Sequence, residues 1–263
     1  MELENKVVLV TGGSAGLGAE ICYAAAKKGA IVITCARRIN LIGQVKERCE
    51  ALSGKAAYAF QLDVADPTSI SALMEKIKNE VGAVDILVNN AGFGIFENFV
   101  DFDSADFYRM FEVNVLGMMV LTQQIAIQML EDKRYGHIIN IASMAGKMAS
   151  PKSTVYSATK FAVLGFSNAL RLELKPANIN VTTVNPGPIA TEFFDKADPS
   201  GNYLKALGNH VIDPEKLAKT IVKSMSHPVR EINRPGYMEV AARFYSLFPA
   251  VGDFLAGGIF NKK

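Results

Sequence analysis

The chain has 263 residues, 49% of them hydrophobic and 21% charged, with a formal net charge of +2. This length suits a single α/β domain over residues 1–263, and the balanced charge argues against nucleic acid or an anionic membrane as partner. The three cysteines lie far apart and away from the three histidines, which indicates reduced thiols and predicts no metal site.

A glycine-rich turn near the N-terminus joins a short apolar strand, residues 6–10, to a predicted helix, residues 19–28. The glycines of such a turn let the backbone approach a pyrophosphate, which then sits at the positive end of the helix. Strand, turn and helix together predict a dinucleotide-binding loop. Its candidate binding residues are Gly12, Ser14, Gly16, Leu17 and Gly18.

The second predicted strand, residues 30–35, ends in Ala36, Arg37 and Arg38. An acidic residue about 20 positions after the glycines usually holds the ribose 2′-hydroxyl of NAD. A carboxylate repels a 2′-phosphate, whereas a guanidinium binds it through charge-assisted hydrogen bonds. The two arginines therefore favour NADP over NAD. The alternative is that they only begin the next helix.

The rest of the chain alternates between strands and helices, which predicts a doubly wound parallel sheet. Further strands are expected at residues 57–62, 84–88, 137–141 and 180–184, and long helices at residues 104–131 and up to residue 174. Ligands bind such sheets beyond the carboxyl ends of the strands, where right-handed crossovers gather the loops. The candidates that follow these strand ends are Asp63, Val64, Asn90, Ala91, Gly92, Ser143, Pro186 and Gly187.

Tyr156 and Lys160 lie four positions apart on a predicted helix, so both side chains can point into one site. A free tyrosine has a pKa of about 10, which is high for proton exchange at neutral pH. A nearby cation favours the phenolate and brings the phenol towards the working range of a general acid or base. The pair alone is also compatible with a packed tyrosine beside a solvated lysine.

Taken together, these motifs resemble the short-chain dehydrogenase/reductase family, in its short, single-domain form. The matching residues occur in the family's order over positions 11–191: Thr11, Gly12, Gly16, Gly18, Asp63, Asn89, Asn90, Ala91, Gly92, Asn114, Ser143, Tyr156, Lys160, Pro186, Gly187 and Thr191. The resemblance implies a Rossmann-like sheet of about seven strands with helices on both faces. Residues 236–240, where many members end their last strand in a glycine pair, have no such pair.

The resemblance also implies the chemistry. Tyr156 would give a proton to the carbonyl oxygen in reduction, Lys160 would lower its pKa and hold the nicotinamide ribose, and Ser143 would bond the substrate oxygen. Asn114 would complete a relay through water to Lys160. Ile189 and Thr191 would join the residues above, Tyr156 and Lys160 included, in binding the cofactor. We therefore predict that the protein is an NADP-dependent carbonyl reductase or alcohol dehydrogenase.

Three other functions were weighed against that reading. An enoyl reductase of the same superfamily typically spaces its tyrosine and lysine more widely, and position 163 is valine here. A sugar-nucleotide epimerase relative would need a larger substrate domain. A scaffold or regulator that binds cofactor without turnover would not need Ser143, Tyr156 and Lys160 together.

Three segments bear on substrate and partners. Residues 107–130 have more apolar positions than one buried helix face needs. The family pairs this helix between subunits, which implies a homodimer or homotetramer. The alternative is full burial of the helix in its own domain.

The apolar tail, residues 236–260, is interrupted by charges and cannot span a bilayer. The tail caps the substrate site, packs on a neighbour or lies on a membrane surface. The absence of an N-terminal signal predicts a cytoplasmic protein.

The substrate loop is expected at residues 191–213 and to form an apolar lid over a ketone or aldehyde with apolar bulk. Its candidate lid residues are Phe193, Phe194, Tyr203 and Leu204, and the candidates for the opposite wall are Phe93, Ile95, Met144 and Met148.

Overall fold

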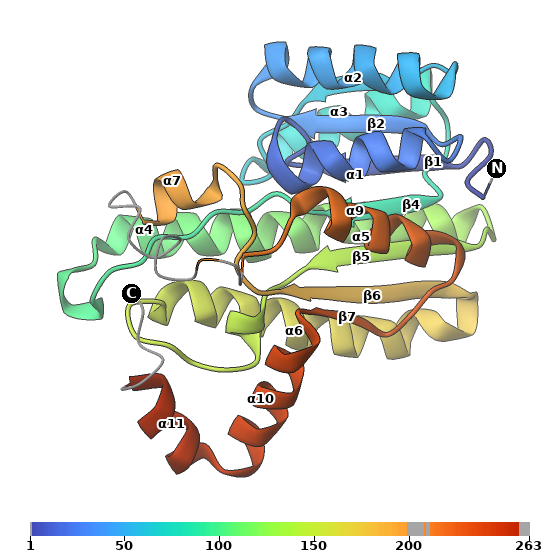
Figure 1. Cartoon of the computed structure of the whole chain (residues 1–263). Helices are drawn as coiled ribbons and strands as arrows, with labels where there is room; N and C mark the ends of the chain where they lie inside the picture. Colours follow the sequence, from blue (N-terminus) through green and yellow to red (C-terminus); the bar gives the residue numbers. More distant parts are fainter. Residues whose placement is uncertain (1, 199–207, 209–210, 258–263) are drawn as a thin grey trace.

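The structure is a computed structural model, which describes residues 2–198, 208 and 211–257. Its centre is a parallel sheet of seven strands in the order β3-β2-β1-β4-β5-β6-β7 (Figure 1). The strands are β1 Val7–Thr11, β2 Ile31–Ala36, β3 Tyr58–Gln61, β4 Ile86–Asn89, β5 Gly136–Ile141, β6 Ile179–Pro186 and β7 Glu231–Arg234. The strand order reverses between β1 and β4, which is where open α/β sheets bind ligands. The predicted Rossmann-like fold is confirmed.

Helices cover both faces of the sheet (Figure 1). One layer contains α1 Gly16–Ala26, α2 Ile39–Ser53 and α9 Pro214–Ser226, and the other contains α3 Pro67–Glu80, α5 Gly117–Glu131 and α6 Thr154–Leu174. Successive side chains of β1 alternate between the two layers: Val8 and Val10 belong to the core under α1, while Val7 and Leu9 belong to the core under α5. Burial on both faces explains why β1 is a continuous apolar run.

The helix predicted over residues 104–131 is not a regular α-helix. It consists of α4 Ser104–Phe111, a π-helical turn at Glu112–Leu116, and α5. The helix crosses very close to the chain after β3, since a Cβ on Gly117 would lie 1.9 Å from the Val64 carbonyl oxygen. Within the described residues, Ser104–Glu131 is the one helix long and apolar enough to cross a membrane by length and composition, and half of its apolar window is buried in the fold.

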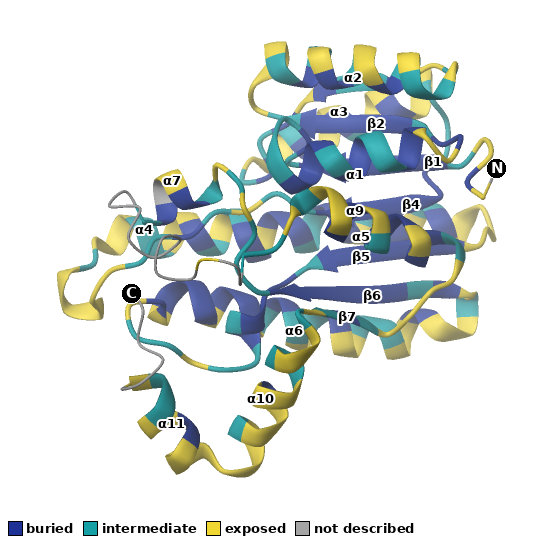
Figure 2. Ribbon diagram, in the orientation of Figure 1, coloured by how far each residue is buried: buried dark blue, intermediate teal, exposed yellow. Residues whose placement is uncertain are grey.

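The C-terminal part differs from the family pattern. The last strand, β7, lies ahead of residues 236–240, and Gly236 instead begins α10, Gly236–Leu247, which is followed by α11, Pro249–Gly257. These two helices, the α10–α11 hairpin, project past the edge strand β7, and their outer faces are largely exposed (Figures 1 and 2). The root of α10 is fixed by Lys147, whose Nζ donates to carboxylates of Glu231 on β7 and Glu239 on α10.

Candidate functional site

A cavity of about 960 Å³ lies at the carboxyl ends of the strands. Its wall combines the glycine-rich turn, the loops after β2, β3, β4, β5 and β6, helix α6 and the α10–α11 hairpin. All residues predicted to bind the cofactor line this one cavity: Gly12, Ser14, Gly16, Leu17, Gly18, Arg37, Arg38, Asp63, Val64, Asn90, Ala91, Gly92, Tyr156, Lys160, Pro186, Gly187, Ile189 and Thr191. The fold therefore gathers them at one edge from segments far apart in the sequence.

The glycine-rich turn is held so tightly that side chains do not fit. Gly12 has a φ of +65°, in the left-handed region that favours glycine. A Cβ on Gly18 would lie 2.3 Å from the Gly12 carbonyl oxygen. Asn90, the first residue after β4, stabilises the turn, because its Nδ2 donates to the carbonyl oxygens of Thr11 at 3.0 Å and Gly12 at 3.2 Å. A bare backbone at the start of α1 thus faces the cavity, which fits a pyrophosphate.

Of the two arginines after β2, Arg38 makes the more informative contacts. Its Nη2 donates to the Ser14 hydroxyl at 3.0 Å, and its Nη1 lies 3.3 Å from a carboxylate oxygen of Glu192. The ion pair is exposed on both sides, and such pairs contribute little to stability. The Arg38 guanidinium is therefore free to exchange Glu192 for another anion beside the glycine-rich turn. Arg37 also lines the cavity.

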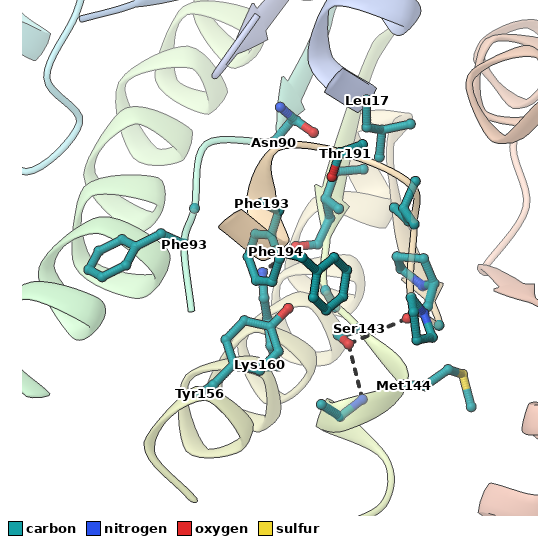
Figure 3. Close-up of a pocket in the computed structure, with 18 of the residues that line it drawn as sticks. Leu17, Asn90, Phe93, Ser143, Met144, Tyr156, Lys160, Thr191, Phe193 and Phe194 are labelled. Carbon is teal, nitrogen blue, oxygen red and sulfur yellow. Dashed lines mark hydrogen bonds between the residues drawn. The ribbon is translucent and has the colours of Figure 1, made fainter. Parts of the chain in front are cut away.

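Tyr156 and Lys160 are one turn apart on α6, and both are buried. The Lys160 Nζ lies 5.7 Å from the centre of the Tyr156 ring and donates to the Ile141 carbonyl oxygen at 2.9 Å. Burial lowers the pKa of Lys160 from 10.5 to about 8, because the charged form loses its hydration. Figure 3 shows both side chains beside Ser143, which comes from the loop after β5.

The Ser143 side chain is buried and oriented by two contacts. Its Oγ accepts from the Ala145 backbone N–H at 3.1 Å and donates to the Pro186 carbonyl oxygen at 3.4 Å, which is a long bond (Figure 3). Because the weak bond carries the hydroxyl proton, that proton can be redirected to a stronger acceptor in the cavity. Ser143 thus has a fixed oxygen and an available donor.

Asn114 lies in the π-helical turn and is buried, but it does not line the cavity. Its Oδ1 accepts from the Phe93 N–H at 2.9 Å, and its Nδ2 donates to the Phe93 carbonyl at 2.8 Å and to Thr159 at 3.2 Å. A Cβ on Gly92 would lie 3.0 Å from this Oδ1 and 3.8 Å from the Lys160 Nζ. In this arrangement Asn114 fastens the loop after β4 beside Lys160. A relay through water stays a prediction.

A model of the short chain dehydrogenase family matches residues 6–201. The chain belongs to this family. It is 34% identical to the ketoacyl reductase HetN of Nostoc over 88% of this chain and 78% of the relative, and 30% identical to an NADP-dependent 3-hydroxy acid dehydrogenase of Schizosaccharomyces pombe over 85% and 88%. A short-chain dehydrogenase from Sphingobium yanoikuyae, solved in complex with NADPH, is 26% identical, with a TM-score of 0.80 and coverage of 95% of each chain.

In the present chain, the segment predicted as a lid forms part of the cavity wall. Phe193 and Phe194 belong to α7, Phe193–Ala197, and both line the cavity, with the Phe193 ring centre 5.7 Å from that of Tyr156. The loop is tied at its two ends, since Ile189 pairs with Ile212 in a parallel bridge. Tyr203 and Leu204 lie outside the described residues.

The opposite wall was predicted with one error. Phe93, Met144 and Met148 line the cavity, but Ile95 does not. It packs instead in an apolar cluster with Met110 behind Tyr156. Successive residues of a regular strand point to opposite sides, so Phe93 and Ile95, two positions apart, would share a side in a strand. The segment after β4 has no regular structure, so this expectation does not hold for it.

Several wall residues were missed. Phe96 lines the cavity, and so does one face of each helix in the α10–α11 hairpin. These hairpin residues are Tyr237, Met238, Ala241, Phe244, Tyr245, Gly252, Leu255 and Ala256. On α10 they recur at the spacing of one helix face, a signal present in the sequence. Of the three roles considered for the tail, capping the cavity is the one that the described geometry exhibits.

Proposed function

We propose that the protein is an NADP(H)-dependent oxidoreductase that interconverts a ketone or aldehyde and an alcohol, with Tyr156 as the general acid and base. The observation that carries the proposal is the meeting of Tyr156, Lys160 and Ser143 at the cavity that also contains the glycine-rich turn. The bound nicotinamide cofactor would supply or accept the hydride. Side chains of this protein would transfer the proton and bind the substrate oxygen.

Each of the three side chains has a distinct task. Tyr156 donates its hydroxyl proton to the carbonyl oxygen during reduction and takes it back during oxidation. Lys160 carries a positive charge close to the phenol ring and stabilises the phenolate that remains. Ser143 donates a hydrogen bond to the same substrate oxygen, where negative charge develops, and its oxygen is already held by Ala145.

The substrate proposed has apolar bulk. The wall that the hairpin and residues 144–150 contribute is made of apolar and uncharged polar residues as far as the structure describes it. Arg109, whose guanidinium carbon lies 5.8 Å from the centre of the Phe93 ring, lines another part of the cavity, so the apolar character belongs to this wall and not to the whole cavity.

A screen of ketones and aldehydes for NADPH oxidation tests the proposed function. Compounds should cover small soluble aldehydes, aromatic ketones and long-chain ketones, each assayed with the wild type and with Tyr156→Phe. Turnover that depends on Tyr156 supports the proposal. NADPH binding without turnover across the whole panel would instead favour a cofactor-binding scaffold.

Arg38→Ala is expected to weaken NADPH binding by about tenfold to a hundredfold and to leave NADH binding unchanged. The physical reason is the loss of a charge-assisted bond to the 2′-phosphate, typically worth about 1.5–3 kcal/mol. Dissociation constants from calorimetry measure the effect. Lys46→Ala, which removes a cation from α2 outside the cavity, is the matched control. Wild-type protein that binds NADH as tightly as NADPH would show that the arginines do not select the phosphate.

We expect the protein to sediment as a dimer or tetramer at micromolar concentration. Leu116 and Ile127 are exposed on one side of the long helix, three turns apart, and Phe161 is exposed on the neighbouring α6. Monomers rarely leave such an apolar surface in water. Leu116→Glu with Ile127→Glu should yield a species of 28.5 kDa, whereas Val100→Glu, also exposed, should not. A wild-type monomer at all concentrations would contradict the expectation.

A further inference from the structure

The α10–α11 hairpin is apolar on both of its faces. The inner face lines the cavity, as described above. The outer face exposes large apolar side chains that do not line it: Val240, Leu247, Phe248, Val251 and Phe254. Leu247 and Phe254 are each 73% exposed. Between these two faces α10 has a polar stripe of Glu239, Arg243 and Ser246, a pattern typical of a helix at the interface between an apolar phase and water.

The exposed apolar residues gather at the tip of the hairpin. Leu247 ends α10, Phe248 is the connection, and Val251 lies in the first turn of α11. The tip, where the two helices are connected, projects away from the sheet past β7 (Figures 1 and 2). A projecting apolar tip can insert into a fluid phase such as a lipid layer, whereas a contact between subunits needs a broad, complementary surface.

The few charged side chains on the hairpin have partners within the protein. Glu239 accepts from Lys147 Nζ and from Arg243 Nε, both at 2.8 Å, at the root of α10. Asp253 accepts from the Tyr245 hydroxyl at 2.7 Å. The Arg243 side chain is 77% exposed and long enough to keep its charge in water when its neighbours are buried. These groups can stay at the level of the lipid headgroups while the apolar side chains of the tip insert, as in helices that lie in a membrane interface.

The two faces are connected at the rim of the cavity. Tyr237 and Phe244 line the cavity and are also exposed, by 56% and 43%. Tyr237 and Phe244 thus place two aromatic rings between the outer face of α10 and the cavity. Aromatic side chains with one polar end, as in Tyr237, are favoured where an apolar phase meets water.

We propose that the α10–α11 hairpin docks on the surface of a lipid layer, with Leu247, Phe248, Val251 and Phe254 inserted among the acyl chains. Docking follows from the apolar tip and does not need anionic lipid, since the hairpin carries two carboxylates and one arginine over residues 236–257. A second consequence rests on the proposed function: a carbonyl substrate dissolved in the lipid would enter the cavity past Tyr237 and Phe244 without crossing water.

The chain has no tryptophan, so a single one introduced at the tip reports its surroundings without background. Phe254→Trp should show a blue-shifted, more intense emission when phosphatidylcholine vesicles are added, and the change should persist in high salt because it rests on apolar burial. Val100→Trp, at a site 89% exposed elsewhere, is the matched control and should not respond. In vesicle flotation, Leu247→Ser with Phe254→Ser should lower the bound fraction at least tenfold, and Val100→Ser with Val229→Ser should not.

Other results would overturn the proposal. A tip tryptophan that ignores vesicles, or binding that salt abolishes, excludes apolar insertion. A blue shift that appears on raising protein concentration without vesicles assigns the tip to a contact between copies of the chain. Reduction of a soluble aldehyde should be equal in wild type and in Leu247→Ser with Phe254→Ser, since neither residue lines the cavity. An inactive wild type that still docks would contradict the proposed function alone.

Discussion

Tyr156→Phe is expected to lower turnover by about 10²- to 10⁴-fold and to leave NADPH binding nearly unchanged. The substitution keeps the ring, which packs against Phe193 and Phe96, and removes only the hydroxyl. The cavity wall and the cofactor loop therefore keep their shape, while the proposed proton donor is lost. Steady-state kinetics on the best substrate from the carbonyl screen, with NADPH titrations on both proteins, measure the two effects separately.

Tyr58→Phe on β3 is the matched control, because it removes a hydroxyl away from the cavity. It should retain wild-type turnover. If Tyr156→Phe were as active as the wild type, Tyr156 would not be the general acid. If NADPH binding fell together with turnover, the hydroxyl would serve mainly to hold the cofactor.

Lys160→Met is expected to abolish measurable turnover and yet to increase the free energy of unfolding by about 2 kcal/mol at neutral pH. The pKa of Lys160 in the fold is about 8, below its ordinary 10.5, so burying the charged form costs about 3 kcal/mol, at about 1.4 kcal/mol for each pKa unit. The variant also loses the hydrogen bond to the Ile141 carbonyl oxygen, which lowers its stability by about 1 kcal/mol and leaves the net gain stated above. Methionine fills a similar volume without a charge.

The pH dependence of stability follows from the same difference between the pKa of Lys160 in the folded and in the unfolded chain. Between about pH 8 and 10.5 the unfolded chain holds a proton on Lys160 that the fold does not, so wild-type stability should rise with pH in this window relative to Lys160→Met. Denaturant unfolding of both cofactor-free proteins at pH 7 and pH 10 tests this. A variant less stable than the wild type at pH 7 would mean that Lys160 is a structural cation. Lys219→Met, at an exposed lysine, is the control.

The parts that sequence could predict are those whose signal is local. The turn from Gly12 to Gly18 needs its residue types within a few positions, and the spacing of Tyr156 and Lys160 needs only one helix. The continuous apolar run of β1 marks a strand buried on both sides. For these, the neighbours in sequence are also the neighbours in space.

The parts that could not be predicted depend on contacts between distant segments. The π-helical turn arises where Gly117 passes the Val64 carbonyl, and no periodicity within residues 104–131 marks it. The Arg38 guanidinium meets Glu192, which is 154 positions away. The last strand ends at Arg234, ahead of Gly236, and the tail after it forms two helices that line the cavity.

The π-helical turn makes this stretch unusual in how it would respond to the loss of a residue. Such a turn holds one residue more than an α-helical turn, so a one-residue deletion within Glu112–Leu116 can be absorbed as regular helix while α5 keeps its place on the sheet. The same deletion would rotate Asn114 away from Phe93. A mutational scan of single deletions should therefore find folded but disabled protein here, and unfolded protein when the deletion falls in the middle of α5.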